Sequence, residues 1–509
     1  MGRVGFTTKP SSAVDKIAFL AFNKHIADEL NKRLAEGRRI EHGSDEQEAI
    51  WKEAMEGSRH IVVNAVAGSG KTSTGVEYCL RSGAAINAMT YHALGFSACR
   101  RQFGNCVQVD QYKMYGIVDR LMPSVNKAAK GLVVMVAGLA KQYAASTRAE
   151  FEWIVDRHDV DLEHYEELVM RGVGPALDRA KDETATIDFD DMVWLPYVMG
   201  LAVNKYDVAI TDEAQDLNKV QQWLAMAASD RHIVVGDKNQ AIYGFRGADS
   251  DGMGRLAEYL RNTPRGMVEM PLNFTRRCPQ SHVRLAKRLV PWIEALEGAV
   301  EGVVRVEASE DKAAGEMRPG DLVVCRTNAP LLSAAYRCIK RGIKAVVRGR
   351  DIGKGIVKLI DEVCRESGEA NPMVNELLRG AEEVTAQAVT KLRLMPNGRG
   401  EMRAQSAQDR MECLHTVCSG GGVVDSHTAR RAVESLFADF ELDGSPKHAV
   451  VFGTQDEGIG GREGVGVKAG SDTASNGQEG QGGGIELRVY RGDEGENGVG
   501  VGRAGMQII

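Results

Sequence analysis

The chain has 509 residues, of which 43% are hydrophobic and 26% charged, and this length allows several domains with separate cores. The formal net charge of −6 excludes a wholly basic, histone-like nucleic-acid binder but allows a local basic groove. Nine scattered cysteines, without zinc-like spacing, predict reduced thiols in a cytoplasmic protein. We expect no membrane contact, because no apolar run approaches the length of a membrane span and the N-terminal segment has no signal-peptide core.

Short apolar runs alternate with helix-like stretches, which favours an α/β fold with buried parallel strands. The runs are Ile17–Phe22, His60–Val66, Ala85–Thr90, Tyr206–Thr211, His232–Gly236 and Leu322–Cys325. The pattern is mainly helical from about Ser97 to Lys181 and again from about Gly355 to Ala438. The glycine-rich stretch Gln455–Ile509 has almost no apolar periodicity, so it predicts a disordered tail.

A strand, a glycine-bearing turn and a helix start follow one another at Ile61–Thr72. The glycines let backbone N–H groups approach phosphate oxygens, Lys71 can reach the β- and γ-phosphates, and Thr72 can bind Mg²⁺. This pattern predicts an ATP site, although the general pattern has glycine where this chain has Ala65. The predicted nucleotide-binding residues of the loop are Ala67, Gly68, Ser69, Gly70, Lys71 and Thr72.

A second apolar strand, Tyr206–Thr211, runs directly into the acidic pair Asp212 and Glu213. At the tip of a strand, Asp212 suits indirect ligation of Mg²⁺ and Glu213 suits the base that orients an attacking water. An acidic surface turn is the alternative, but a buried strand that feeds straight into two acids is less typical of such a turn.

Several segments together resemble UvrD/Rep-type superfamily 1 DNA helicases of bacteria or phages. Val235–Ala248 is similar to the family pattern G-D-x-x-Q-S-I-Y-x-F/W-R-G-A, and the phosphate loop has the family form A-x-A-G-S-G-K-T. Further resemblances lie at Asp45–Ile50, Thr90–Phe96, Ile187–Met192, Thr275–Pro279 and Val323–Asn328. The resemblance covers roughly residues 15–355.

The resemblance implies ATP and Mg²⁺ as cofactors, and single-stranded DNA and duplex junctions as partners. It implies catalytic roles for Asp212, Glu213, Gln240 (a γ-phosphate sensor) and Arg277 (an arginine finger), with Mg²⁺ held through Thr72 and Asp212. Gln47 would read adenine, whereas the adenine-stacking aromatic of the family falls at Arg276. The implied DNA-binding residues are Phe22, Asn23, Thr90, His92, Tyr243, Phe245 and Arg246.

The implied architecture is α/β, with two RecA-like motor domains that carry parallel sheets and helical insertions. The first motor domain spans 1–96 and 186–275, interrupted by a helical insertion at 97–185. The second, incomplete, motor domain begins at 276–354 and ends in a strand at 441–454. A helical insertion lies between these parts at 355–440, and the glycine-rich tail occupies 455–509.

The chain departs from the family pattern at two places. Phe19–Leu30 resembles a DNA-binding segment that follows the phosphate loop in the family but precedes it here, through natural rearrangement or an assembly error. Two C-terminal motifs, T-x-H-x-x-K-G-L-E-A and Y-V-A-x-T-R-A-K, are not found after Thr454. The back-translated tail, read one nucleotide forward, permits both motifs in family order. This predicts a frameshift, with a natural glycine-rich tail as the alternative.

We therefore predict an ATP-dependent DNA helicase that couples ATP hydrolysis to movement on single-stranded DNA and to unwinding, impaired in this chain by its altered C-terminus. One alternative is a non-catalytic remnant that binds ATP and DNA. Another is a phosphate-loop ATPase that acts on proteins or small molecules, which the DNA-facing residues disfavour.

Overall fold

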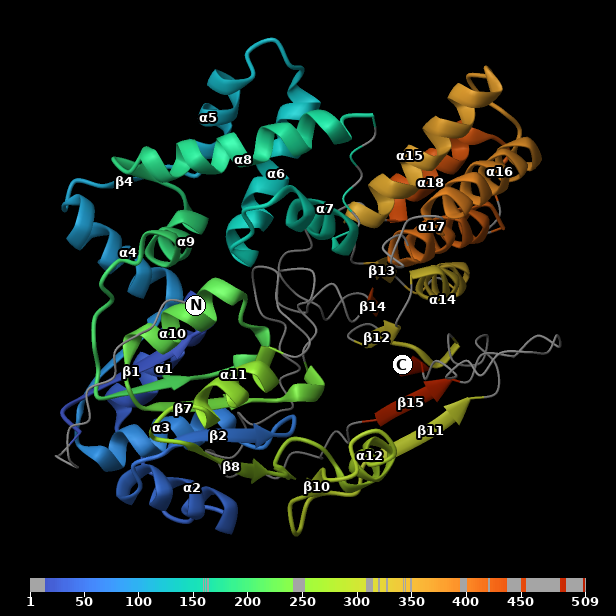
Figure 1. Ribbon diagram of the computed structural model, residues 1–509. Helices are drawn as coiled ribbons and strands as arrows, with labels where there is room; N and C mark the ends of the chain where they lie inside the picture. The colour runs from blue at the N-terminus through green and yellow to red at the C-terminus, as the bar shows by residue number, and fades with distance from the viewer. Residues whose placement is uncertain are drawn as a thin grey trace. The chain divides into compact units, whose positions relative to one another are not determined.

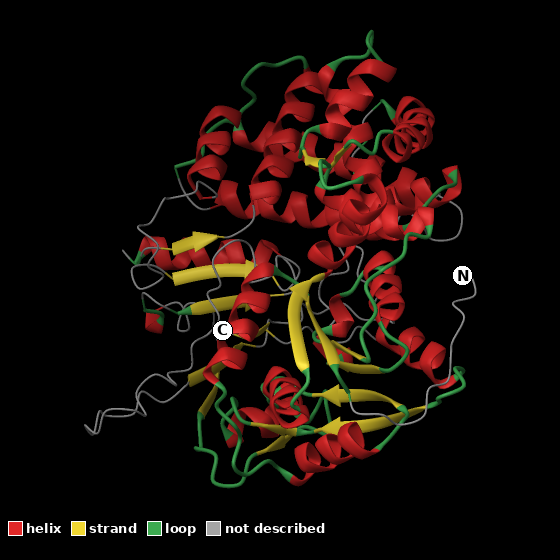
Figure 2. Cartoon of the chain, turned by 90° about the vertical axis from the view of Figure 1, so that its left-hand side faces the viewer, coloured by secondary structure: helices red, strands yellow, loops and turns green. Residues whose placement is uncertain are grey.

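The computed structural model describes residues 14–158, 160, 162, 164–240, 252–307, 315–318, 321–325, 328–341, 343, 345–347, 350–393, 401–419, 422–436, 450–454, 486–490 and 507–508. They belong to two units, Met1–Cys278 with Val283–Ala299, and Pro279–His282 with Val300–Ile509. Helices predominate over strands, as the red segments of Figure 2 show. In these described ranges, no helix is both long and apolar enough to cross a membrane.

A six-stranded parallel sheet, in the order β3-β1-β6-β7-β2-β8, lies at the centre of the first unit (Figure 1). Its strands are β1 (Lys16–Ala21), β2 (His60–Ala65), β3 (Ala85–Thr90), β6 (Val208–Thr211), β7 (His232–Gly236) and β8 (Met267–Leu272). Helices pack on both faces of a parallel sheet, so its inner strands are apolar on both sides. The strands expected from the apolar runs are confirmed to within two residues at each end.

Strand β1 occupies an interior position of this sheet although it precedes the phosphate loop in the chain. Ile17 and Phe19 belong to the core on one face, and Leu20 belongs to the core on the other. The carboxylate of Asp207 accepts the N–H groups of Asp15 and Lys16, each at 2.9 Å, and so ties the start of β1 to the start of β6. The early strand therefore reaches the sheet between β3 and β6.

Helices fill most of the chain between β3 and β6, as expected, and α5–α8 gather away from the sheet in Figure 1. The helices of the first unit are α1 (Lys24–Glu36), α2 (Asp45–Glu56), α3 (Lys71–Ser82), α4 (Tyr91–Phe103), α5 (Lys113–Leu121), α6 (Lys127–Tyr143), α7 (Arg148–Arg157), α8 (Glu166–Asp182), α9 (Phe189–Met199), α10 (Lys219–Ala228) and α11 (Gly252–Arg261). Two short strand pairs accompany them, β4 (Gln108–Val109) with β5 (Thr186–Ile187), and β9 (Phe274–Thr275) with β10 (Glu294–Ala295).

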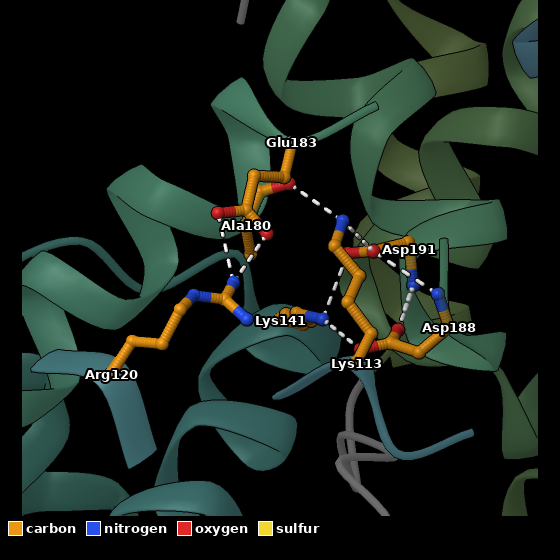
Figure 3. Close-up of polar contacts among 7 residues, drawn as sticks. All are labelled: Lys113, Arg120, Lys141, Ala180, Glu183, Asp188 and Asp191. Atoms are coloured by element: carbon orange, nitrogen blue, oxygen red, sulfur yellow. Dashed lines mark hydrogen bonds and ion pairs between the residues drawn. The ribbon is translucent and has the colours of Figure 1, made fainter. Parts of the chain in front are cut away.

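A buried ionic cluster joins α5, α6 and α9 (Figure 3). The ammonium of Lys113 donates to Asp191 at 2.6 Å and to the carbonyl of Ala180 at 2.8 Å. Lys141 lies 2.5 Å from Asp188 and 2.8 Å from Asp191. Burial alone would lower the pKa of Lys141, but the two carboxylates outweigh it and raise that pKa. The two carboxylates therefore favour the charged form of Lys141 inside the protein.

The second unit contains another sheet, in the order β11-β15-β16-β12-β14-β13, in which the short β16 is antiparallel to its neighbours. Its strands are β11 (Val303–Glu307), β12 (Leu322–Cys325), β13 (Ala345–Val347), β14 (Val450–Thr454), β15 (Glu486–Tyr490) and β16 (Gln507–Ile508). Its helices are α14 (Asn328–Lys340), α15 (Arg350–Ser367), α16 (Val374–Arg393), α17 (Glu401–Ser419) and α18 (Ser426–Leu436). The helix α12 (Gln280–Ala286) contains the boundary between the units.

The structure differs from the expected organisation at two places. Val283–Ala299 groups with the first unit, because Val283 and Ile293 pack on Val66 at the end of β2. Within the expected disordered tail, β15 and β16 are strands of the second sheet. The run E-L-R-V-Y of β15 alternates polar and apolar residues, which is the pattern of a strand with one buried face. The other tail residues lie outside the described ranges.

Candidate functional site

The sequence-predicted groups of the first unit gather at one edge of its sheet. Because all six strands are parallel, the segments that follow them emerge at the same edge, where ligands of open α/β sheets bind. The phosphate loop follows β2, the acidic pair follows β6, and the turn Lys238–Gln240 follows β7. Arg277 follows β8, while Asn23 and Thr90 lie at the ends of β1 and β3.

The phosphate loop has the backbone of an anion-binding turn. Gly68 and Gly70 have φ of 72° and 87°, left-handed backbone values that residues other than glycine rarely adopt. Gly70 caps α3 without a side-chain hydrogen bond, so the first N–H groups of that helix face the loop. The hydroxyl of Ser69, which is 2% exposed, has no hydrogen-bond partner among the described residues. A buried, unpartnered hydroxyl in such a loop fits a phosphate ligand.

Lys71 is the first residue of α3, and two polar side chains from other segments lie close to its ammonium group. Its Nζ lies 2.7 Å from the carboxylate of Glu213 and 3.5 Å from the amide oxygen of Gln240. Gln215 donates to the same carboxylate oxygen of Glu213 at 2.9 Å. Glu213 has a left-handed backbone φ of 51°, which is uncommon for a residue other than glycine and is often found at functional sites. The structure therefore brings together Lys71, Glu213 and Gln240, three of the candidate site residues.

Thr72 and Asp212 form the second part of the site. The hydroxyl of Thr72 donates to Asp212 at 2.6 Å. Burial, and after it the charge of Glu213, raises the pKa of Asp212. One hydroxyl and one carboxylate fit Mg²⁺, which keeps several waters and takes further oxygens from phosphates. The described residues contain no group of three or more His, Cys, Asp or Glu side chains able to hold a metal by themselves.

Gln47 lies beside the phosphate loop, in the first turn of α2. Ser44 caps this helix and forms a reciprocal capping box with Gln47, which orders the side chain. Its Nε2 donates to the hydroxyl of Thr74 in α3 at 3.0 Å, and its Oε1 accepts from the guanidinium of Arg276 at 2.8 Å. Gln47 thus lies next to the phosphate loop, and its hydrogen bond with Arg276 has no counterpart in the sequence predictions.

Arg277 also lies close to the phosphate loop within the first unit. A Cβ atom added to Gly68 would meet the Cβ of Arg277 at 2.6 Å and the hydroxyl of Thr275 at 2.8 Å. The segment after β8 therefore packs directly on the loop.

The DNA-facing candidates of β1 and β3 lie next to each other, because Ala21 pairs with Thr90. Asn23 accepts the N–H of Ile26 and caps α1, while Thr90 accepts the N–H of Ala93 and caps α4. Phe22 and His92 are half-buried, and burial lowers the pKa of His92. Tyr243, Phe245 and Arg246 lie outside the described residues.

Sequence reasoning missed Gln215, which links two parts of the site. Its amide N–H group donates to Glu213, and its amide oxygen accepts the N–H of Asp237 after β7 at 3.0 Å. The only sequence signal is its place two residues after Glu213, in the run D-E-A-Q-D.

Residues 140–260 match the family described as the UvrD/REP helicase N-terminal domain. An ATP-dependent DNA helicase PcrA of Staphylococcus aureus is 33% identical over 96 residues, which are 17% of this chain and 13% of that protein. DNA helicase II of Escherichia coli is 30% identical over 101 residues, 18% of this chain and 14% of the relative. A probable DNA helicase II homolog of Mycoplasma pneumoniae is 32% identical over 96 residues, 18% of this chain and 13% of the relative.

The aligned segments thus span about a seventh or less of these relatives. The family match begins after the phosphate loop and contains Asp212, Glu213 and Gln240. It also contains three members of the buried cluster, Lys141, Asp188 and Asp191. Over this matched region, the chain resembles UvrD/Rep-type helicases.

Proposed function

We propose that this chain is an ATP-dependent DNA helicase motor, in which ATP hydrolysis drives movement on single-stranded DNA and unwinding of duplex junctions. The observation that carries the proposal is the convergence of Lys71, Glu213 and Gln240 beside the Thr72–Asp212 pair, at the carboxyl edge of a parallel sheet. The family match and the DNA helicases similar to this chain support DNA as the substrate.

In the proposed site, the phosphate loop wraps the β- and γ-phosphates with its backbone N–H groups. Lys71 exchanges its contact with Glu213 for the phosphates, since both are within reach of its flexible ammonium. Thr72, and Asp212 indirectly, would hold Mg²⁺, which would supply positive charge to offset the charge that develops on the phosphates. Glu213, once released from Lys71, orients the attacking water and accepts its proton. Gln240 contacts the γ-phosphate, and Arg277 donates to the developing charge as an arginine finger.

For DNA, we propose that the backbone is contacted from the adjacent ends of β1 and β3, by Asn23 and Thr90 with their neighbours Phe22 and His92. Tyr243 and Arg246 would face the strand, and Phe245 would stack on a base. Two RecA-like motor domains, with the boundaries given above, would alternate their grip on the strand as the nucleotide state changes.

Titration of the full chain with fluorescent ATP tests the nucleotide site. Lys71→Ala removes the main cation that faces the phosphates and should abolish binding, whereas Glu213→Gln should keep binding and lose hydrolysis. Lys52→Ala, which changes an exposed lysine of α2, is the matched control and should leave both unchanged. Unchanged affinity in Lys71→Ala would overturn the phosphate-loop assignment, and loss of binding in Glu213→Gln would give Glu213 another role.

We also propose that turnover is impaired. Arg277 would supply one arginine finger, while the arginine of the Y-V-A-x-T-R-A-K motif is not found after Thr454, where back-translation permits it only in the shifted frame. A missing finger costs about 10³–10⁵ in rate. A chain with the frame restored after Thr454 should hydrolyse ATP and unwind DNA faster than this chain. Equal rates in the two chains would contradict the impairment.

A further inference from the structure

The carboxamide of Gln47 has a fixed orientation, set by a chain of hydrogen bonds behind it. The hydroxyl of Thr74 donates its single hydrogen to the carbonyl of Gly70 at 2.9 Å. The group that faces this hydroxyl from Gln47 must therefore be the donor Nε2, which lies at 3.0 Å. The opposite atom, Oε1, then faces the N–H of Ser44 at 3.2 Å and Arg276 at 2.8 Å, both of which are donors.

These contacts use both lone pairs of the Gln47 oxygen. A glutamine that reads adenine must accept from the 6-amino group and donate to N7, because adenine presents one donor and one acceptor on that edge. With Arg276 in place, Gln47 can offer a ligand a hydrogen of Nε2 but no acceptor. The guanidinium of Arg276 itself adds donors only.

Arg276 is held in this place by more than its contact with Gln47. Its backbone N–H donates to the carbonyl of Gly68 in the phosphate loop at 2.8 Å. The neighbouring strand segment is tied to α2, because the N–H of Asn273 donates to Glu46 at 2.9 Å. A Cβ atom on Gly70 would lie 3.5 Å from Nε2 of Gln47 and 4.0 Å from Nε of Arg276. Both side chains therefore border the same end of the phosphate loop.

We propose that Arg276 is a specificity-determining residue, which turns the base-reading end of the nucleotide site into a surface of donors only. Such a surface fits a purine with acceptors at both position 6 and N7, as in guanine, whose O6 and N7 pair with arginine. Adenine presents its 6-amino donor to the same surface, where one donor opposes another. The site therefore accepts guanine nucleotides at least as well as ATP. This inference rests on the proposed nucleotide site.

The test is a competition titration of the full chain, in which unlabelled ATP, GTP and ITP displace a fluorescent nucleotide. ITP keeps the O6 and N7 acceptors of guanine and lacks its 2-amino group, so it isolates the edge that Arg276 faces. Arg276→Phe frees one lone pair of the Gln47 oxygen, and Arg276→Met does so with an unbranched chain of similar reach. Arg261→Ala removes another exposed arginine of the same unit and is the matched control.

We expect GTP and ITP to bind the unaltered chain at least as tightly as ATP. Either Arg276 variant should shift the ratio of GTP to ATP affinity toward ATP by on the order of tenfold, which is the scale of one lost base contact. An unaltered chain that prefers ATP, or a ratio that does not move in the Arg276 variant that folds, overturns the inference while the proposed function stands. If all three nucleotides bind no better than to Lys71→Ala, the proposed function fails as well.

Discussion

Replacing Lys141 with methionine removes one of two ammonium groups from the buried ionic cluster of α5, α6 and α9. The Lys141 side chain is 1% exposed and Asp191 is fully buried, so water cannot replace the lost charge. Asp188 loses its 2.5 Å partner and keeps the N–H of Asp191 at 2.7 Å. Two lysines face Asp188 and Asp191, and the neighbouring Asp190 interacts with the same Lys141, so the substitution leaves these carboxyl groups with one ammonium fewer.

Removal of one partner of a buried ion pair costs about 3–5 kcal/mol. We expect Lys141→Met to lower the free energy of unfolding of the first unit by about this amount. The double change Lys141→Met with Asp188→Asn removes one charge of each sign and should recover a large part of the loss. Arg120→Met breaks the nearby pair with Glu183, where the Arg120 side chain is 59% exposed, and should cost about 0.2–1 kcal/mol.

Urea unfolding followed by tryptophan fluorescence measures these differences, and the ring of Trp194 lies 5.5 Å from the Lys141 ammonium. Mid-points and slopes give the free energy of unfolding for each variant. A Lys141→Met loss as small as that of Arg120→Met would refute the reasoning, because it would mean that the cluster is screened by water.

Three further predictions follow from other parts of the chain. Gly68→Ala should weaken nucleotide binding, because Gly68 has a φ of 72° and an added Cβ would lie 2.6 Å from the Cβ of Arg277. Gly37 also has a positive φ, of 62°, but an added Cβ there would meet no atom within 4 Å, so Gly37→Ala is the control and should leave binding unchanged. Burial lowers the pKa of His60 to about 4 and that of His232 to about 3, so both stabilise the fold in the neutral form. The free energy of unfolding should therefore fall as pH falls below about 6.5, by on the order of 1.4 kcal/mol per pH unit for each histidine, and replacing both with glutamine should flatten that slope in urea titrations at several pH values. Phe245→Ala should weaken single-stranded DNA binding by about 1–3 kcal/mol regardless of base sequence, and unchanged affinity in a filter-binding assay would contradict the stacking role.

The sequence predicts the first sheet well because strands buried on both faces are continuous apolar runs. His60–Val66 and His232–Gly236 are such runs, and the structure has β2 and β7 there. The position of Lys71 against Glu213 follows from the same logic, since parallel strands place the residues after them at one edge. Local pattern and one topological rule are sufficient for this part of the site.

Contacts between segments far apart in the chain could not be predicted in this way. Arg276 and Gln47 are 229 positions apart, and nothing in either segment encodes their hydrogen bond. A lysine normally indicates a solvated position, even within an apolar helix such as the one that contains Lys141. The carboxylates that pair with Lys141 lie 47 or more positions away in the chain. Strand β15 lies in a glycine-rich stretch whose overall composition predicts disorder, although its five residues alternate polar and apolar as a strand does.

The interior position of β1 has a consequence for how the protein folds during synthesis. Lys16, at the start of β1, pairs with Ala85 of β3 on one side. On the other side its N–H donates to Asp207, just before β6, which lies 191 positions later in the chain. At about 5–20 residues per second, a ribosome needs roughly 10–40 s to make the intervening chain. During that interval the apolar β1 has one open hydrogen-bonding edge, which can pair with other nascent chains. Slow translation of this stretch should therefore favour aggregation, and chaperones that cover apolar strands should raise the yield of folded protein.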